Sequence, residues 1–341
     1  MKSIIEAGDL KGKRVLVRVD WSVPTQNGEV LDDYPIKKSI PTIEYLVKAG
    51  ASIVLISHAE RDTESLAPIF EHAKQYLPML TFIEPSNLVL LENLRQNPGE
   101  KENSAKYAKE LAKLGDIYVN EAFSESHREY ASMVGVPKLL PSFAGLRLKE
   151  EVDRLSSAFY PKRPFLFILG GAKFDTKLPL LKKFTNIADY IFVGGALANN
   201  FFKEQGKDIG SSLVKEGNYG LKELLDTGKI ILPEDTIIDA GKIMDVGPRT
   251  IENLKSKVSS SKLVLWNGPL GFCELGYRVA TLELAKLISE FSNESIIGGG
   301  DTLAAIKELN ILDKFSFVST GGGAMLDFLA TGTLPGIEAL K

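Results

Sequence analysis

Short apolar runs alternate with helical segments along almost the whole chain, and this alternation limits the possible fold more than any other feature. Runs suited to strands lie at residues 14–19, 51–56, 81–83, 89–91, 117–119, 165–169, 190–193, 263–266, 295–297 and 315–319. Segments typical of helices separate many of them, as at residues 36–49, 66–76 and 104–114. Strands that alternate with helices are typical of parallel sheets, so we predict an α/β fold with doubly wound parallel sheets.

The length of the chain indicates two domains. It has 341 residues, of which 44% are hydrophobic and 25% are charged, as is ordinary for a globular protein. A chain of this size typically forms about two domains, each able to bury its own core. Residues 148–159 are amphipathic and lead into Tyr160-Pro161, and we predict that they form a helix connecting the domains.

Charge and cysteine content exclude several classes of function. A net charge of −3 provides no global basic field for nucleic acid or for an anionic membrane, so an anion site has to come from local clustering. A single cysteine, Cys273, excludes an internal disulfide and fits a reducing compartment; we interpret it as a small core residue. Residues 1–13 do not resemble a signal peptide, and no apolar run approaches the ~18 residues of a membrane span. We therefore expect a cytoplasmic protein.

Basic and polar residues follow the strands of the first half. Ligands of open α/β sheets bind outside the carboxyl ends of the strands, so we expect these residues to meet at one sheet edge. Arginines there would bind a small polyanion through forked hydrogen bonds. Any single arginine could equally be a solvated loop charge or part of a structural ion pair, but recurrence after successive strands favours an anion site. The residues are Asp20, His58, Arg61, Arg95, His127 and Arg128, with Arg18 inside the first strand.

Glycine-containing turns follow the strands of the second half. Such turns at successive strand ends indicate that the backbone approaches a large ligand, and a nucleotide fits best because helix N-termini bind phosphate. The turns contain Gly170 and Gly171, Gly194 and Gly195, Gly268 and Gly271, Gly298 to Gly300, and Gly321 to Gly323.

Two lysines and an aspartate add charge to these turns. Lys173 and Lys177 are four residues apart at the start of a predicted helix, so both ammonium groups can reach one polyphosphate. Taken alone, their segment is also consistent with a tight turn before a solvated helix. Asp301 could hold Mg²⁺ that also binds phosphate oxygens, or it could cap the helix that starts at Leu303. If the edges of the two halves face each other, the reaction class is phosphoryl transfer.

With these residues in place, the chain resembles phosphoglycerate kinase over nearly its whole length. The motifs that carry the resemblance are RVDWSVP, SHAERD, LLENLR, NEAFSESHR, LGGAKFDTK, DVGPRT, LVLWNGPLG, IIGGGDT and STGGGA, in the order and spacing of the family. That family transfers a phosphoryl group between 1,3-bisphosphoglycerate and ADP, giving 3-phosphoglycerate and ATP. The resemblance implies a glycolytic, cytoplasmic, monomeric kinase with Mg²⁺ as cofactor, ATP or ADP as substrate, and no nucleic-acid or membrane partner.

The resemblance also implies two doubly wound parallel-sheet (Rossmann-like) domains joined by a hinge helix. Residues 1–147 would bind the glycerate substrate, and the C-terminal segment 324–341 would return to this domain. Residues 148–160 would form the hinge helix, and residues 161–323 would bind Mg-nucleotide. Domain closure would bring the substrates together and exclude water. Neither direction needs a general base, because the attacking oxygen is already anionic, so positioning and charge stabilisation supply the catalysis.

Site residues carry over by matching position. The substrate would be bound by Arg18, Asp20, Ser22, His58, Arg61, Arg95 and Arg128. The nucleotide would be bound by Gly171, Lys173, Lys177, Gly194, Gly195, Asn267, Glu274, Gly298, Gly299, Gly300, Asp301, Thr302, Gly321 and Gly322. The catalytic candidates are Lys173, Lys177 and Arg128, and the metal ligand is Asp301.

The sequence departs from the family pattern mainly in its first half. Most important, Pro35 stands where the family has an arginine assigned to the transferring phosphoryl group. The other replacements are Ser22 for asparagine, Glu60 for glycine, Tyr130 for histidine and, in the second half, Thr176 for aspartate. The chain is also short for the family, with much of the missing length between residues 233 and 245.

These departures leave three interpretations open. The first is a working, divergent phosphoglycerate kinase in which Lys37 or Lys38 substitutes for the missing arginine. The second is a kinase of another acyl-phosphate or carboxylate substrate. The third is a nucleotide-binding protein with weak or lost catalysis that acts through partners. The phosphate-contacting residues of the second half favour the first two, and the retained basic residues of the first half favour the first.

Overall fold

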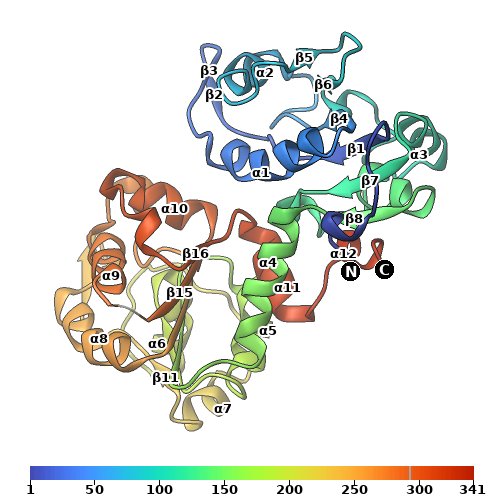
Figure 1. Cartoon of the computed structure of the whole chain (residues 1–341). Coiled ribbons are helices and arrows are strands. Elements are labelled where there is room, and N and C mark those ends of the chain that lie inside the picture. Colours follow the sequence, from blue (N-terminus) through green and yellow to red (C-terminus); the bar gives the residue numbers. More distant parts are fainter. Residues whose placement is uncertain (292) are drawn as a thin grey trace. The chain divides into compact units, whose positions relative to one another are not determined.

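Among the residues that the structure describes, 1–291 and 293–341, each half of the chain forms its own six-stranded sheet. The structure is a computed structural model (Figure 1). Contacts divide the chain into a first unit, Met1–Asp153 with Thr333–Lys341, and a second unit, Arg154–Gly332. The predicted division into two α/β halves is confirmed.

The first unit has the strand order β5-β6-β4-β1-β7-β8, and every neighbouring pair is parallel. The strands are β1 Arg14–Arg18, β4 Ser52–Ile56, β5 Thr81–Phe82, β6 Leu88–Leu90, β7 Ile117–Asn120 and β8 Ser142–Ala144. The helices are α1 Tyr34–Lys48, α2 Ala67–Ala73, α3 Ala105–Ala112 and α12 Pro335–Glu338. A short hairpin, β2 Thr25–Gln26 with β3 Glu29–Val30, precedes α1.

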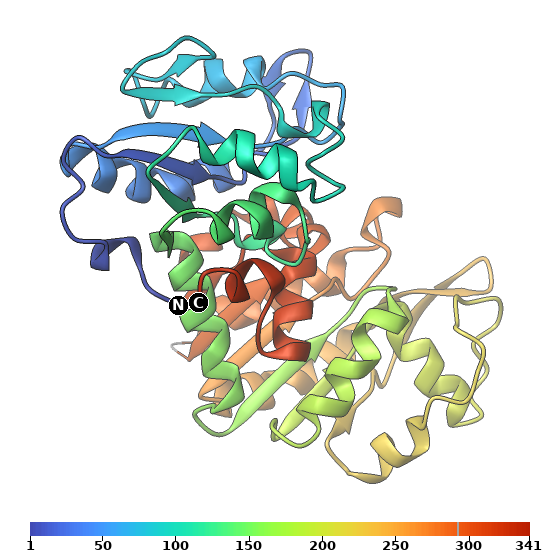
Figure 2. The ribbon, with the colours of Figure 1, turned by 90° about the vertical axis from the view of Figure 1, so that its right-hand side faces the viewer.

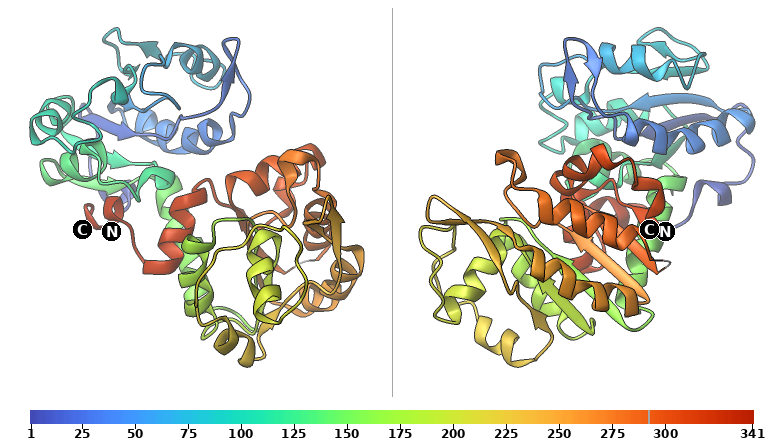
Figure 3. Two further views of the ribbon diagram at one scale, coloured as in Figure 1. Left: turned by 180° about the vertical axis from the view of Figure 1, so that it is seen from behind. Right: turned by 90° about the vertical axis from the view of Figure 1, so that its left-hand side faces the viewer.

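The second unit has the strand order β11-β10-β9-β14-β15-β16, again with parallel pairs throughout. The strands are β9 Phe165–Leu169, β10 Tyr190–Val193, β11 Ile230–Ile231, β14 Leu263–Asn267, β15 Glu294–Gly298 and β16 Phe317–Val318. The helices are α5 Phe174–Phe184, α6 Gly195–Glu204, α7 Leu221–Asp226, α8 Pro248–Ser260, α9 Val279–Ser289, α10 Gly300–Ile306 and α11 Gly322–Thr331. Figure 3 shows this unit from two further sides, with helices on both faces of its sheet.

The central strands are buried along their whole length. Every residue of β9 and of β14 is buried, and in β1 only the first residue is exposed. Helices on both faces remove such strands from water, which is why they occur in the sequence as continuous apolar runs and not as alternating patterns. None of the helices in the described part of the chain has the length and apolarity that a membrane crossing requires.

Helix α4, Leu146–Ser156, carries the chain from the first unit into the second. A 3-10 turn, Ser157–Phe159, continues it, so the predicted connecting segment is helical. Its role as a hinge stays a prediction. Helix α11 packs against α5 and belongs to the second unit, so the segment that returns to the first unit begins at Thr333, later than the predicted boundary at residue 324.

Both chain ends belong to the first unit, where Figure 2 shows the N and C labels close together. The amide of Ala144 in β8 donates to the carbonyl of Lys2 over 2.8 Å. The amide of Gly336 in α12 donates to the carbonyl of Ser126 over 2.8 Å. Backbone hydrogen bonds therefore hold both terminal segments to this unit.

One hairpin of the second unit was not predicted. It consists of β12 Thr236–Asp239 and β13 Lys242–Val246, paired antiparallel. Three of the four residues of β12 are exposed, so the segment lacks the apolar run that identifies a buried strand.

Candidate functional site

In each unit some of the predicted site residues lie beside the point where the order of strands reverses. The reversal lies between β1 and β7 in the first unit and between β9 and β14 in the second. Open α/β sheets bind ligands at such points, outside the carboxyl ends of the strands. In register, Arg18 faces Asn120 in the first unit, and Leu169 faces Asn267 in the second.

Arg18, His58, Glu125 and Arg95 form one connected group, which we call the cation cluster. Arg18 is fully buried; its Nη2 lies 2.9 Å from His58 Nδ1, and its Nε donates to Ser132 Oγ over 3.1 Å. His58 Nε2 lies 3.5 Å from Glu125 Oε1. Arg95 Nη2 donates to the other carboxylate oxygen of Glu125 over 3.0 Å. One carboxylate thus joins the histidine to the arginine.

The contacts of the cluster determine its protonation. Arginine only donates, so His58 Nδ1 accepts from Arg18 and the ring proton sits on Nε2, toward Glu125. Burial lowers the pKa of His58, the hydrogen bond to Glu125 opposes the shift and the charge of Arg18 adds to it, so the neutral ring is favoured. Burial opposes ionisation of Glu125, but the hydrogen bond from His58 and the charges of Arg18 and Arg95 outweigh it and hold the pKa of Glu125 well below its ordinary value. The carboxylate is therefore ionised.

The remaining predicted substrate residues lie in more open positions. Asp20 accepts a hydrogen bond from the hydroxyl of Ser124 and, over 3.4 Å, from the amide of Ser22. Arg61 and Arg128 are exposed, and Arg61 Nε lies 3.7 Å from a carboxylate oxygen of Glu64. Arg61 and Arg128 are therefore accessible to a ligand, whereas Arg18 is enclosed and acts on its neighbours.

Lys37 and Lys38, the predicted substitutes for the missing arginine, already have partners. Lys37 Nζ lies 3.1 Å from Asp33 Oδ1 and 5.6 Å from the centre of the Tyr76 ring. Lys38 Nζ lies 5.1 Å from the centre of the Tyr34 ring. Neither ammonium group is therefore an uncommitted replacement in this structure.

Sequence reasoning missed Glu125 and Glu121. Glu121 is buried beyond the end of β7, where it accepts from Thr42 Oγ1 over 2.5 Å and from the amide of Arg147 in α4 over 3.1 Å. Burial raises the pKa of Glu121 to about 8. Both glutamates lie in the motif NEAFSESHR, so acidic residues inside a predicted anion site were the available signal. The Tyr130 ring, also in this region, stacks 5.7 Å from the Arg95 guanidinium.

In the second unit, several glycines are required by turns that pack against one another. The amide of Gly171 donates to the carbonyl of Pro269 over 2.7 Å. A side chain at Gly170 would come within 2.3 Å of that same oxygen, and one at Gly195 within 2.5 Å of the Gly171 nitrogen. A side chain at Gly194 would meet the core instead, 2.7 Å from a methyl of Leu270. Packing is thus one reason why a side chain does not fit at these positions, and Gly171 and Gly195 also line the cavity described below.

The glycines after β15 and before α11 differ in the space around them. A side chain at Gly300 would have no heavy atom within 4 Å, and one at Gly322 would meet only backbone, at 3.3 Å or beyond. Gly299 adopts φ +104, a conformation that L residues rarely adopt, and a side chain at Gly298 would collide with the Met325 sulfur. Gly321 precedes α11 and donates to Ser319 Oγ over 3.2 Å. Of these, Gly300 leaves its backbone most open to a ligand.

Lys177 and Lys173 differ in exposure. Lys177 is in the first turn of α5, is 5% exposed, and donates to the carbonyl of Gly170. Side chains at Gly171 or Gly268 would come within 2.7 Å of its ammonium, so both turns enclose it. Burial lowers the pKa of Lys177 to about 8, with Asp301 opposing the shift. Lys173 caps α5 and is exposed.

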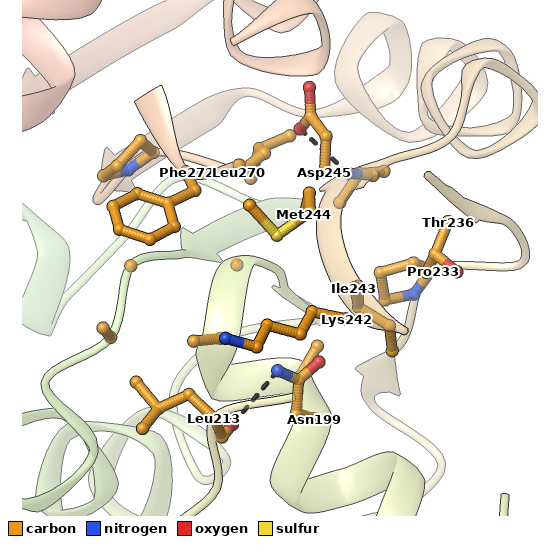
Figure 4. Close-up of a pocket in the computed structure, with 18 of the residues that line it drawn as sticks. Asn199, Leu213, Pro233, Thr236, Lys242, Ile243, Met244, Asp245, Leu270 and Phe272 are labelled. Carbon is orange, nitrogen blue, oxygen red and sulfur yellow. Dashed lines mark hydrogen bonds between the residues drawn. The ribbon is translucent and has the colours of Figure 1, made fainter. Parts of the chain in front are cut away.

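A cavity of about 470 Å³ opens beside these turns (Figure 4). Its lining is mostly apolar with few polar groups, as in small-molecule sites. The labelled side chains come from α6, from the segment between α6 and α7, from the β12–β13 hairpin and the residues before it, and from the turn after β14. Asn199 donates to the carbonyl of Leu213 over 3.1 Å across one wall. The predicted residues Gly171, Gly195, Glu274 and Asp301 line the same cavity.

The polar residues of this region differ in burial. Asp301 is exposed in the first turn of α10, whereas Thr302 is buried and accepts from the amide of Gly268 over 3.0 Å. Asn267 is buried, with Nδ2 3.6 Å from the Met325 sulfur. Within the described ranges, no cluster of three or more histidine, cysteine or acidic residues is present to hold a metal by itself. A single carboxylate suits Mg²⁺ that is held largely by phosphate oxygens and water.

Comparison with known proteins agrees with this arrangement. The family model described as phosphoglycerate kinase matches residues 5–332. A phosphoglycerate kinase of Leptospira biflexa is 37% identical over 386 aligned positions, which cover 99% of this chain and 98% of that protein. A phosphoglycerate kinase of Thermus thermophilus is 37% identical over 390 positions, with 100% of both chains covered.

Solved structures give the same result. The phosphoglycerate kinase of Coxiella burnetii has a TM-score of 0.86 and 35% identity, and it covers 99% of this chain and 98% of its own. That of Pyrococcus horikoshii has a TM-score of 0.87 at 27% identity, and the match covers 100% of this chain and 98% of its own.

Proposed function

This chain belongs to the phosphoglycerate kinase family, and from this membership we propose that it catalyses reversible phosphoryl transfer between 1,3-bisphosphoglycerate and ADP, giving 3-phosphoglycerate and ATP. The observation that carries the proposal is the cavity of the second unit. It combines an apolar lining with glycine turns and Asp301, and its wall at Gly171 adjoins the buried ammonium of Lys177. An apolar chamber beside cationic, N–H-rich turns is what a nucleoside polyphosphate requires.

In the second unit, Lys177 is the proposed partner of the transferring phosphoryl group. Its ammonium lies in a site of low water content, where it interacts with phosphate charge more strongly than an exposed lysine does. Without a ligand it is held by the carbonyl of Gly170, so a phosphate oxygen can take the place of that acceptor. Exposed Lys173 would reach the outer phosphates. Asn267, Glu274, Thr302 and the glycine turns remain the proposed contacts of the nucleotide.

Asp301 is the proposed metal ligand because it is the carboxylate that lines the cavity at the first turn of α10. Mg²⁺ bound there would offset the negative charge of the phosphate oxygens. The chain itself would supply one ligand and orient it on a helix.

In the first unit, the cation cluster and its surroundings are the proposed glycerate site. Arg95 and the exposed Arg61 and Arg128 supply donors for the anionic groups of the substrate. Buried Arg18 holds the His58 ring in one orientation. Asp20 and Ser22 are the proposed contacts of the hydroxyl group of the substrate. Because the two substrates bind on separate units, we infer that domain closure brings them together. The proposal includes a monomeric cytoplasmic enzyme.

The test is turnover of 3-phosphoglycerate with Mg-ATP by the purified protein, coupled to removal of the acyl-phosphate product. We expect turnover that Asp301→Ala lowers by about 10²-fold or more, because a charge-stabilising group is lost. Asp313→Ala, a change at an exposed aspartate of the same unit, is the matched control and should leave the rate unchanged.

Absence of turnover in a protein that still binds Mg-ATP would contradict the proposal and would favour a changed substrate or a lost activity. Full activity of Asp301→Ala would contradict the metal assignment alone.

A further inference from the structure

We propose that Glu125 is a specificity-determining residue: its carboxylate occupies the anion position between Arg95 and His58, and a substrate has to replace it there. The inference rests on the proposed phosphoglycerate kinase function of the first unit. The carboxylate of Glu125 would act as a resident anion, and competition with it would determine which ligands the cation cluster binds.

The position of Glu125 matches that of a bound anion. Its two oxygens face two different donors, Arg95 Nη2 at 3.0 Å and His58 Nε2 at 3.5 Å. The ring of His58 is oriented for this contact by Arg18 on its other side. The charge of Asp20 also acts on His58, and Asp62 lies within electrostatic reach of both Arg95 and His58. A phosphate or carboxylate ligand would use these same donors, so it competes with Glu125 directly.

The carboxylate of Glu125 is also placed so that it can move out of the position between Arg95 and His58. It is the last residue of the short 3-10 helix Phe123–Glu125, and its side chain is 14% exposed. Rotation about its side-chain bonds carries the carboxylate toward solvent without moving a sheet strand. The side chain of Arg95 is equally accessible, at 14%, so a ligand can reach it once the carboxylate has gone.

Competition with a tethered carboxylate selects against small anions. The resident group is present at a high effective concentration and loses no translational freedom when it binds, whereas a free anion does. An inorganic anion gains little beyond the donors that Glu125 already satisfies. A glycerate substrate gains further contacts from Arg61, Arg128 and Asp20, so it can overcome the competition. Glu125 therefore favours an extended phosphorylated acid over phosphate alone.

The experiment compares the wild-type chain with Glu125→Gln, which keeps the shape and removes the charge. We expect inhibition by inorganic phosphate to strengthen about tenfold, which corresponds to ~1.4 kcal/mol. The KM for 3-phosphoglycerate should fall as well, while the KM for ATP, whose proposed site lies on the other unit, should not change. Glu129→Gln removes an exposed carboxylate four residues further along and is the matched control. A residue that merely stabilises the fold would change the melting temperature and leave this selectivity as it is.

Direct binding tests the inference independently of catalysis. Inorganic phosphate is titrated into each protein while the ring signals of the three histidines are followed by NMR. The His58 signals should respond at lower phosphate concentration in Glu125→Gln and in Glu125→Ala than in the wild type. Equal or weaker phosphate binding by folded variants would overturn the inference. Stronger binding by the variants in a protein without turnover would support it while contradicting the proposed function.

Discussion

The two units present anion sites of different construction. In the first unit the donors are charged side chains, and a carboxylate from the same chain, Glu125, already engages Arg95 and faces His58. In the second unit the site is built from glycine turns without charged side chains, several of whose N–H groups already donate within the protein, and Lys177 is held by a carbonyl oxygen. Buried charges need counter-charges when no ligand is bound, whereas N–H dipoles carry no net charge and do not.

This difference is consistent with the expectation that most departures from the family pattern fall in the first half of the chain. A site of charged side chains can exchange partners, so Pro35, Ser22 and Tyr130 can be accommodated by neighbours. A site of interlocked turns cannot accept a Cβ at positions such as Gly170, where a carbonyl oxygen lies 2.3 Å away. The first unit is thus open to change in specificity, and the second is constrained by sterics.

The largest expected effect on turnover comes from removing the ammonium group of Lys177, which is buried in the candidate site of the second unit. Lys177→Met keeps the aliphatic stem and should lower kcat by about 10²–10³-fold, because transition-state charge loses a desolvated partner. Lys182→Met, at an exposed position on the same helix, is the control. Turnover assays with both variants make the measurement; near-normal kcat in Lys177→Met would remove the lysine from the mechanism.

A smaller effect is expected from a substitution in the first unit, where the candidate site consists of charged side chains. Arg95→Ala should raise the KM for 3-phosphoglycerate by about 10–100-fold, since a charge-assisted hydrogen bond is typically worth ~1.5–3 kcal/mol. The KM for ATP should not change. Steady-state kinetics with each substrate varied in turn measure the two KM values. Arg14→Ala, at an exposed position of the same unit, is the control. Equal changes in both KM values would argue against separate sites on the two units.

Glycine substitutions separate packing from ligand approach. Gly300→Ala should fold normally, because no heavy atom lies within 4 Å of the new methyl group, and should raise the KM for ATP several-fold if a phosphate approaches that backbone. Gly170→Ala should instead destabilise the fold, because its methyl group meets a carbonyl oxygen. Melting temperatures and KM for ATP are measured for both. An unaltered KM in Gly300→Ala would assign that glycine to helix geometry alone.

The smallest effect concerns the pH dependence of stability in the first unit. The pKa of Glu121 is raised from 4.5 to about 8, mainly by burial. The folded state therefore holds a proton that the unfolded chain releases, so this group's contribution to the free energy of unfolding falls as pH rises from 4.5 to about 8. The slope is ~1.4 kcal/mol per pH unit at most.

Glu121→Gln should remove this pH dependence. The free energy of unfolding of the variant should therefore increase relative to that of the wild type as the pH rises. Urea unfolding at several pH values makes the measurement. Parallel stability curves for the two proteins would show instead that the hydrogen bonds from Thr42 and the α4 backbone keep the carboxylate ionised.

The sequence by itself determined the architecture and the family, and it indicated the candidate site residues. Continuous apolar runs that alternate with helices predicted two parallel sheets, because a strand covered on both faces has no reason to alternate. Glycines after successive strands indicated where the backbone turns closely, and the motif order indicated the family. These features are local, so spacing alone reveals them.

Only the tertiary structure decided which charges face a ligand and which face each other. Arg18 and Ser132 are 114 residues apart, and Arg95 and Glu125 are 30 apart, yet each pair is in hydrogen-bond contact. Arginine has the same appearance in a sequence whether it is enclosed, as Arg18 is, or exposed, as Arg128 is. Burial and ion pairing depend on the summed geometry of the sheet and its loops, and this geometry placed an unpredicted carboxylate within the anion site.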